Sequence, residues 1–190
     1  MSRIDCKVYT YNNLLSALSD LSARGASVFP IGESVAGRMI LCVRVGDGCG
    51  AQLLVHGGIH AREHLTAALV AAMARYALEK PLPPHTGAYF VPMVNPDGVS
   101  LSQFGLRSLR DGSLRRAAAG LNAGEPDFTM WKANAAGVDL NCHFDAAWGE
   151  GARNVTTPGA HGYIGKAPGT APESVALLSL TARVHPAVTV

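Results

Sequence analysis

The chain has 190 residues, a length typical of one domain or of part of a larger one. Apolar residues make up 48% and charged residues only 16%, which provides enough apolar surface for a sizeable core and excludes disorder of the whole chain. The 16 basic and 14 acidic residues give a net charge of +2 and are scattered, which argues against a nucleic-acid groove lined by clustered Lys and Arg.

The amino terminus, MSRIDCKVYT, has no apolar stretch behind its basic residue, so it does not resemble a secretory signal. No apolar run reaches the ~20 residues that a membrane-spanning helix needs. The four cysteines show no Cys-x-x-Cys spacing. We therefore expect a cytoplasmic protein that has reduced thiols and does not bind membranes.

The first third of the chain predicts one helix followed by three strands. Leucines recur on one helical face over 12–24, and Gly25 ends this helix. Apolar runs predict strands over 27–31, 38–45 and 51–56. The glycine-rich stretch 46–50 can adopt the positive φ angles of a hairpin turn, so we expect the strands on either side of it to pair.

The rest of the chain alternates helices with strands. Residues 63–80 are rich in Ala, Leu, Met and Glu and stop before Pro81, which predicts the clearest helix of the chain. A further helix is predicted over 172–184, and short strands are predicted over 88–94, 137–141 and 187–190. Residues 99–135 are long and irregular, which is typical of a functional loop or of short helices. This alternation predicts an α/β fold, a sheet layered with helices.

One short segment, Val55–His64, has the most informative chemistry. It places His60 and Glu63 three residues apart at a strand-to-helix junction, where an imidazole and a carboxylate can face one metal ion. His60 follows the carboxyl end of a predicted strand, the edge at which α/β sheets bind ligands. The alternative is structural: His60 is then a helix-entry residue, and Glu63 is a favourable charge at the helix N-terminus.

Two further loops follow predicted strands. Asn95–Gly98 reads Asn-Pro-Asp-Gly, and Asn141–Phe144 reads Asn-Cys-His-Phe. Turn chemistry alone would explain the first loop, and a strand-end cap would explain Asn141. The occurrence of all three segments in this order favours a common site.

Taken together, these segments resemble the motifs of the zinc carboxypeptidase A-like peptidase family, and the resemblance extends from Tyr9 to Val190. The matching stretches are Gly32–Arg38, His56–Glu63, Val94–Gly98, Trp131–Asn134 and Gly137–Asn141. The resemblance implies a single zinc carboxypeptidase-like catalytic domain over 1–190, with a mixed, mostly parallel sheet flanked by helices. It also implies zinc-assisted hydrolysis of peptide bonds, the activity of a metallocarboxypeptidase.

The resemblance implies roles for individual residues. His60 and Glu63 would be the first two ligands of one zinc ion. Arg62 and Asn141 would bind the substrate. Lys132 stands where the family has an Arg that stabilises the oxyanion, so it would keep the catalytic charge without the planar bidentate fork.

One departure from the family pattern concerns the substrate. The family has an Arg that pairs with a free C-terminal carboxylate, and this sequence has Cys142 at that position. A subgroup that cleaves γ-D-glutamyl–diamino acid bonds of bacterial wall peptides is similar in lacking that Arg, so we expect a muropeptide-type substrate. An alternative is that Cys142 is a nucleophile. It is disfavoured because the adjacent His143 would face the opposite way, as neighbouring strand residues do.

A second departure concerns the metal. The family's third zinc ligand is a His at the carboxyl end of the strand after the 172–184 helix, and its general-base Glu lies further on. The sequence stops within that strand, so we expect the third ligand beyond Val190 and an incomplete catalytic domain that lacks its C-terminal strands. His185 lies roughly 15 Å away, at the other end of the strand. Substitute ligands would be His143, which is the best placed, His64 and His161.

The missing strands have one further consequence. A sheet without its last strands would expose an edge and apolar surface, so we expect self-association through that edge. The other expected partners are Zn²⁺ and a peptide or muropeptide substrate.

Two alternatives stand beside a truncated metallopeptidase. The first is a non-catalytic peptide- or muropeptide-binding module of the same fold, which metal content would separate from an enzyme. The second is an unrelated α/β hydrolase or nucleotide-binding protein. The sequence argues against the second because it has no Gly-x-Gly-x-x-Gly, no Gly-Lys-Ser/Thr loop and no Gly-x-Ser-x-Gly elbow.

Overall fold

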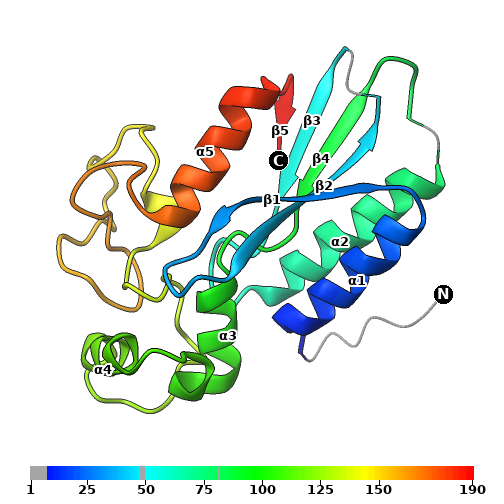
Figure 1. The fold of residues 1–190 in the computed structure, drawn as a ribbon. Helices are drawn as coiled ribbons and strands as arrows, with labels where there is room; N and C mark the ends of the chain where they lie inside the picture. Colours follow the sequence, from blue (N-terminus) through cyan, green and yellow to red (C-terminus); the bar gives the residue numbers. More distant parts are fainter. Residues whose placement is uncertain (1–7, 48–49, 81) are drawn as a thin grey trace.

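A mixed five-stranded sheet separates two layers of helices in the computed structural model, which describes residues 8–47, 50–80 and 82–190 (Figure 1). In spatial order the strands are β1 (Ser27–Glu33), β2 (Met39–Gly46), β4 (Gly87–Val91), β3 (Gln52–His56) and β5 (Val188–Thr189). The β1–β2 and β2–β4 pairs are antiparallel, whereas β3 pairs in parallel with both β4 and β5. The predicted α/β class, with a mixed sheet flanked by helices, is confirmed, but the expected predominance of parallel pairs is not found among the described strands.

Helices cover both faces of this sheet. α1 (Tyr11–Ala23) and α2 (His64–Glu79) lie on one face, and α5 (Pro172–Val184) lies on the other (Figure 1). The segment between β4 and α5 contains α3 (Pro96–Phe104), α4 (Gly112–Leu121) and the 3₁₀ turns η1 (Gly105–Ser108) and η2 (Leu140–Cys142). No helix in the described parts of the chain is long and apolar enough to cross a membrane.

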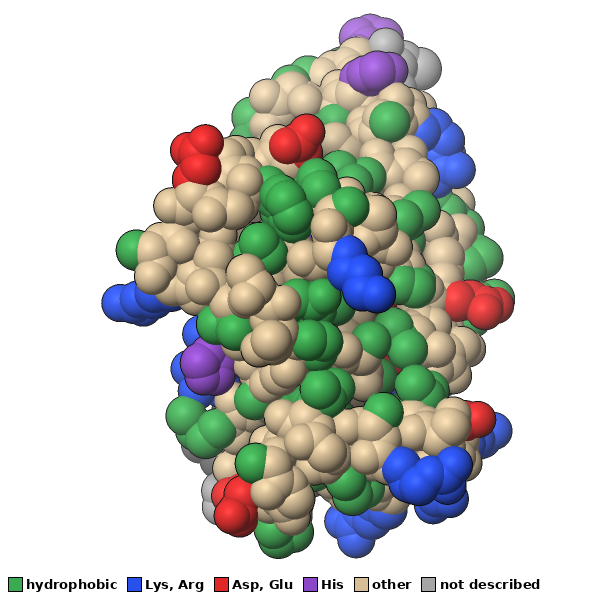
Figure 2. All heavy atoms as spheres, turned by 90° about the vertical axis from the view of Figure 1, so that its left-hand side faces the viewer, with side chains coloured by type: hydrophobic (Ala, Val, Ile, Leu, Met, Phe, Trp, Pro, Cys, Tyr) green, Lys and Arg blue, Asp and Glu red, His purple; other side chains and the backbone are tan. Residues whose placement is uncertain are grey.

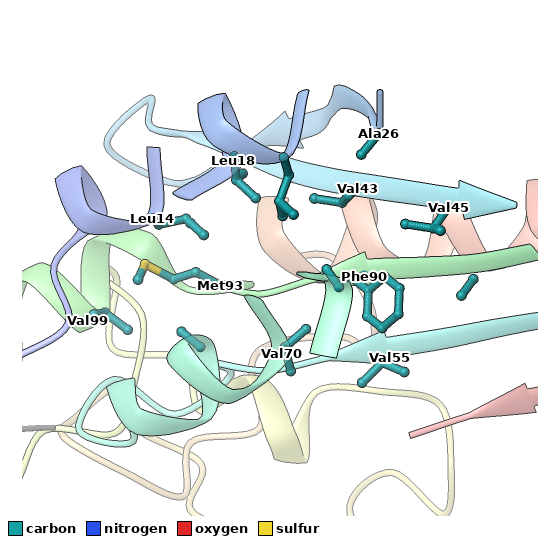
Figure 3. Close-up of a cluster of buried hydrophobic side chains, with 14 residues drawn as sticks. Leu14, Leu18, Ala26, Val43, Val45, Val55, Val70, Phe90, Met93 and Val99 are labelled. Carbon is teal, nitrogen blue, oxygen red and sulfur yellow. The ribbon is translucent and has the colours of Figure 1, made fainter. Parts of the chain in front are cut away.

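Side-chain alternation along the central strands forms two cores. Val43 of β2 and Phe90 of β4 face α1 and α2, where they pack with Leu14 and Val70 (Figure 3). Residues at the intervening positions pack with α5 on the other face: Ile40, Cys42, Leu54 and Val91. Strands that are buried on both faces are almost continuously apolar, which is why the sequence revealed them.

Two sequence predictions about this sheet are wrong. β2 and β3 do not form a hairpin, because β4 lies between them and pairs with both; residues 48–49 of the predicted turn lie outside the described residues. Residues 137–141 do not form a strand. The N–H of Val138 donates to the side chain of Asn134, and the chain then turns into η2. Pairing with the distant strand β4 prevents the hairpin, and the hydrogen bond to the Asn134 side chain prevents the strand at 137–141.

Two of the four cysteines lie in the described residues. Cys42 and Cys142 are free. Cys6 and Cys49 lie outside the described residues. On the face that Figure 2 shows, Lys and Arg side chains lie singly over the upper part and the middle, and several lie near one another at the lower end.

The β5 edge and the adjoining face of α2 expose apolar surface. Two residue pairs join β5 to β3, and Val188 of β5 is exposed. α2 exposes Leu65, Leu69, Met73 and Tyr76, and the last three line an almost wholly apolar groove of about 370 Å³. Self-association through this edge stays a prediction.

A buried ion pair anchors the β1–β2 turn to α3. The fully buried carboxylate of Asp97 accepts hydrogen bonds from the Arg38 guanidinium and, at 2.6 Å, from the N–H of Ala36. Arg38 also donates to the carbonyl of Ser108 at 2.6 Å. The Asn-Pro-Asp-Gly stretch therefore starts a helix, with Asn95 as its N-cap, and is more than a turn.

We expect Asp97→Ala to lower the free energy of unfolding by about 3 kcal/mol, because it leaves a mostly buried guanidinium without its partner. Urea unfolding followed by circular dichroism measures the change. Asp145→Asn removes an exposed carboxylate and serves as the control, with an expected change below about 0.5 kcal/mol. Equal stability of the two variants would show that the ion pair does not anchor the turn.

Candidate metal centre

The β3–α2 connection brings His60 to the carboxyl edge of the sheet. Gly58 has a φ of +59°, which glycine adopts without strain, and a Cβ on Gly57 would lie 2.8 Å from the carbonyl oxygen of Thr66. β4 ends beside this turn, where the N–H of Gly57 donates to the carbonyl of Val91 at 3.0 Å. Two parallel strands thus bring their following loops to one place.

His60 lies between two carboxylates. Its Nδ1 lies 3.1 Å from Oε1 of Glu63, and its Nε2 lies 3.2 Å from Oδ1 of Asp139. The His60 side chain is only 15% exposed, whereas that of Glu63 is 43% exposed. Glu63 is the N-cap of α2, but its carboxylate makes no capping hydrogen bond. The Glu63 carboxylate is therefore not used to cap the helix and can face His60.

The two carboxylates make His60 more basic. The hydrogen bond with Asp139 raises the pKa of His60, burial lowers it, and the contact with Glu63 raises it, so that the net shift is upward. Burial would raise the pKa of Asp139, but hydrogen bonds from His60 and from the N–H of Gly162 outweigh burial and lower it. Asp139 is therefore an ionised group that can hold the imidazole in one orientation.

Asp139 is the candidate that sequence reasoning missed. Its Oδ2 accepts the N–H of Gly162 at 2.8 Å, and its own N–H donates to the carbonyl of Tyr163 at 2.9 Å. It is far from His60 in sequence, so no local spacing links the two residues. A signal was nevertheless available, because Asp139 is the acid within Gly137–Asn141, one of the stretches that gave the family resemblance.

Lys132 and Cys142 lie close to this pair. The N–H of Ala61 donates to the carbonyl of Lys132 at 3.0 Å, which holds the backbone of Lys132 against the residue that follows His60. Burial and the charge of Asp139 raise the pKa of the Cys142 thiol, and the charge of Lys132 lowers it. A carboxylate, a thiol and an ammonium group thus share one neighbourhood.

The side chains of Arg62 and Asn141 make no hydrogen bond with His60, Glu63 or Asp139 in the described parts of the chain. Nη1 of Arg62 lies 3.5 Å from Sδ of Met130, an exposed side chain. Asn141 is exposed in η2, and it contacts the His60–Asp139 pair through its backbone N–H, which donates to Oδ1 of Asp139 at 3.3 Å. Both side chains are positioned at the surface, where they can meet a ligand.

His143, the best placed substitute ligand, is not available to a metal. It is 1% exposed, and its Nδ1 lies 2.7 Å from the carbonyl oxygen of Ile164. Its Nε2 accepts the N–H groups of Thr170 and Ala171 at 2.9 and 2.8 Å. Both ring nitrogens bind backbone groups, so His143 closes the 142–171 loop onto the start of α5.

In the described part of the chain, two side chains are suitable zinc ligands. His60 and Glu63 place an imidazole nitrogen and a carboxylate oxygen side by side, and both are groups that zinc accepts. A carboxylate on the other ring nitrogen, here Asp139, is the arrangement that orients imidazole ligands in metal sites. Within 8–47, 50–80 and 82–190, no three His, Cys, Asp or Glu side chains are grouped so that they could hold an ion.

The chain belongs to the zinc carboxypeptidase family, whose model Peptidase_M14, described as "Zinc carboxypeptidase", matches residues 11–190. Among curated proteins, it is similar to gamma-D-glutamyl-L-diamino acid endopeptidase 1 of Lysinibacillus sphaericus, with 36% identity over 166 residues. It is also 35% identical over 165 residues to the uncharacterized protein YqgT of Bacillus subtilis (strain 168). The alignments cover 80% and 79% of this chain but 41% and 43% of the relatives, so the chain spans about two fifths of their length.

Solved structures show the same fold. Bovine thrombin-activatable fibrinolysis inhibitor, in complex with tick carboxypeptidase inhibitor, matches with a TM-score of 0.70 and 20% identity over 96% of this chain and 58% of that one. The carboxypeptidase A of Helicoverpa armigera matches with a TM-score of 0.69 and 22% identity over 97% and 45%. Murein-tripeptide amidase MpaA of Escherichia coli O157 matches with a TM-score of 0.52 and 26% identity over 88% and 62%.

We expect Asp139→Asn to lower the pKa of His60, because the hydrogen bond with Asp139 is the largest influence that raises it. Stability from the raised His60 pKa is present below the unfolded value of ~6.5 and is lost as the pH rises through the folded value. Stability from the lowered Asp139 pKa is present above the unfolded value of ~3.9. The stability advantage of the wild type over Asp139→Asn should therefore be largest near pH ~5 and smaller above pH ~7.

NMR titration of the His60 ring and urea unfolding at both pH values test this expectation. A stability advantage that increases from acidic to alkaline pH would contradict the proposed contact between His60 and Asp139.

Proposed function

We propose that this chain forms one zinc carboxypeptidase-like catalytic domain and provides the first two zinc ligands of a peptide hydrolase. Its proposed substrates are γ-D-glutamyl–diamino acid bonds of cell-wall peptides. The observation that supports this most directly is the imidazole of His60, which faces the carboxylate of Glu63 on one side and is held by Asp139 on the other.

Each residue has a role in this proposal. His60 and Glu63 would hold the zinc ion, which when bound polarises the scissile carbonyl and lowers the pKa of a water molecule. Asp139 would keep the imidazole in its ligating orientation. The ammonium group of Lys132 would offset the negative charge that develops on the carbonyl oxygen. Arg62 and Asn141 would contact the substrate.

A third zinc donor would come from residues that follow Val190 in a longer form of the protein. β5 runs parallel to β3, and the carbonyl of Val190 accepts the N–H of His56 at 2.9 Å. A residue just after Val190 would therefore emerge at the edge where His60 lies. His185 does not fit this role, because it ends α5 in a left-handed conformation before β5 begins.

Cys142 supports the wall-peptide substrate. A thiol cannot form the paired hydrogen bonds that an Arg makes with a free carboxylate, so a peptide's C-terminal carboxylate would lack that partner here. The similarity to a relative named as a gamma-D-glutamyl-L-diamino acid endopeptidase supports the same choice, as does the similarity to a murein-tripeptide amidase. We propose that such wall peptides are the substrate class.

Zinc binding tests the ligand assignment. We expect the purified chain to bind Zn²⁺ in equilibrium dialysis, and His60→Ala and Glu63→Gln to lose that binding because each removes a donor. Asp139→Asn should weaken binding by about tenfold or more, the usual cost of losing the partner of a ligating His. His85→Asn, which removes an imidazole that is 81% exposed and has no role in the proposed site, is the matched control. If the wild type retains no more zinc than His60→Ala, the non-catalytic binding module is the better assignment.

Peptide binding by the zinc-loaded chain tests the substrate class. We expect tighter binding of a γ-D-glutamyl–diaminopimelate peptide than of a peptide that ends in a free hydrophobic residue. Cys142→Arg should reverse this preference by about tenfold, since a bidentate Arg–carboxylate contact is worth about 1.5–3 kcal/mol. Cys142→Ala removes the thiol without adding charge and should keep the original preference. Calorimetry measures both affinities, and a wild-type preference for the hydrophobic peptide would overturn the assignment.

A further inference from the structure

We propose that Glu173 is a positioning residue for this site: through Asn134, its buried carboxylate holds the 131–139 loop that presents Lys132 and Asp139. The proposal rests on the function proposed above, but it concerns a residue that touches neither His60 nor Glu63. It assigns a role to a buried acid that the metal and substrate contacts leave unused.

The two carboxylate oxygens of Glu173 face two hydrogen-bond donors. The residue lies in the first turn of α5 and is fully buried. Its Oε1 accepts the N–H of Val35 at 3.1 Å, and its Oε2 accepts Nδ2 of Asn134 at 2.9 Å. Two donors thus meet two acceptor oxygens. Burial and the charge of Asp97 raise the pKa of Glu173 and outweigh the hydrogen bonds from Asn134 and Val35, so the net shift is upward.

Asn134 can face Glu173 in one orientation only. Its Oδ1 accepts the N–H groups of Ala136 and Val138, each at 3.0 Å, so its amide nitrogen must point the other way, toward the carboxylate. Its backbone N–H donates to the carbonyl of Val138 at 2.9 Å, which closes the loop on itself. The side chain of Asn134 is fully buried, so water cannot replace a lost partner.

The loop that Asn134 closes presents site residues at both ends. Near its start, the carbonyl of Lys132 accepts the N–H of Ala61. At its end, Asp139 contacts Nε2 of His60. The orientation of the imidazole therefore depends on Asp139, the position of Asp139 depends on the loop, and the loop depends on the hydrogen bond between Asn134 and Glu173.

A reversal of hydrogen-bond polarity tests this proposal. Glu173→Gln offers one oxygen and one NH₂ group to two donors, so either Val35 or Asn134 loses its acceptor. Asn134→Asp places two carboxylates face to face. In the double variant, the new amide at position 173 donates to the new carboxylate at position 134, and its oxygen accepts the N–H of Val35. All hydrogen bonds are restored at unchanged net charge.

Two readouts separate positioning from stability alone. The first is the ¹⁵N–¹H correlation of the His60 ring, which reports the hydrogen bond from Nε2 to Asp139. The second is Zn²⁺ affinity, measured by competition with a chelator. We expect Glu173→Gln to shift or broaden the ring signal and to weaken Zn²⁺ binding about tenfold. The double variant should recover the wild-type signal and an affinity within about threefold of wild type. Glu33→Gln, which changes an exposed carboxylate, should change neither readout.

The outcomes are distinguishable. A Glu173→Gln variant that unfolds more easily but keeps the wild-type ring signal and Zn²⁺ affinity would overturn the positioning role. A folded double variant whose ring signal stays altered would also overturn the positioning role. This measurement on the double variant is informative even if neither single variant folds. If the wild type binds no Zn²⁺ while the ring signal follows the variants as expected, the zinc site fails and the positioning role stands.

Discussion

The contact between His60 and Asp139 is the interaction on which the rest of the site depends. It joins the β3–α2 connection to the 131–139 loop, two segments that are distant in sequence. Because Asp139 occupies Nε2, the other ring nitrogen is left to face Glu63. An imidazole without this partner could rotate about its side-chain bonds, and the donor pair would no longer be fixed in advance of metal binding.

Side-chain hydrogen bonds to the backbone hold the loops around this contact in place. Asn95 donates to the carbonyls of Ile59 and Ala133 and accepts the N–H of Gly98, so one buried amide joins three segments. In the 131–139 loop, the side chain of Asn134 accepts the N–H groups of Ala136 and Val138. Irregular backbone can be buried only when its polar groups find such partners. Asn95, which turn chemistry alone could explain from the sequence, is therefore a structural support of the site, and so is Asn134.

The sequence predicts those parts of the fold that local patterns encode. The helices at Tyr11–Ala23, His64–Glu79 and Pro172–Val184 follow from apolar periodicity and from Gly or Pro at their boundaries. The strand order does not follow, because β4 enters between β2 and β3 through pairing of distant segments. Likewise, the closeness of His60 and Glu63 could be expected from their spacing, whereas the role of Asp139 required the folded chain.

X-ray absorption at the zinc edge of the metal-loaded chain tests the zinc site most directly. Coordination by His60 and Glu63 predicts nitrogen and oxygen neighbours at about 2.0–2.2 Å, with the outer-shell scattering of one imidazole that His60→Ala abolishes. A sulfur neighbour at about 2.3 Å, or an imidazole signal that survives His60→Ala, would show that zinc binds elsewhere and would contradict the proposed centre.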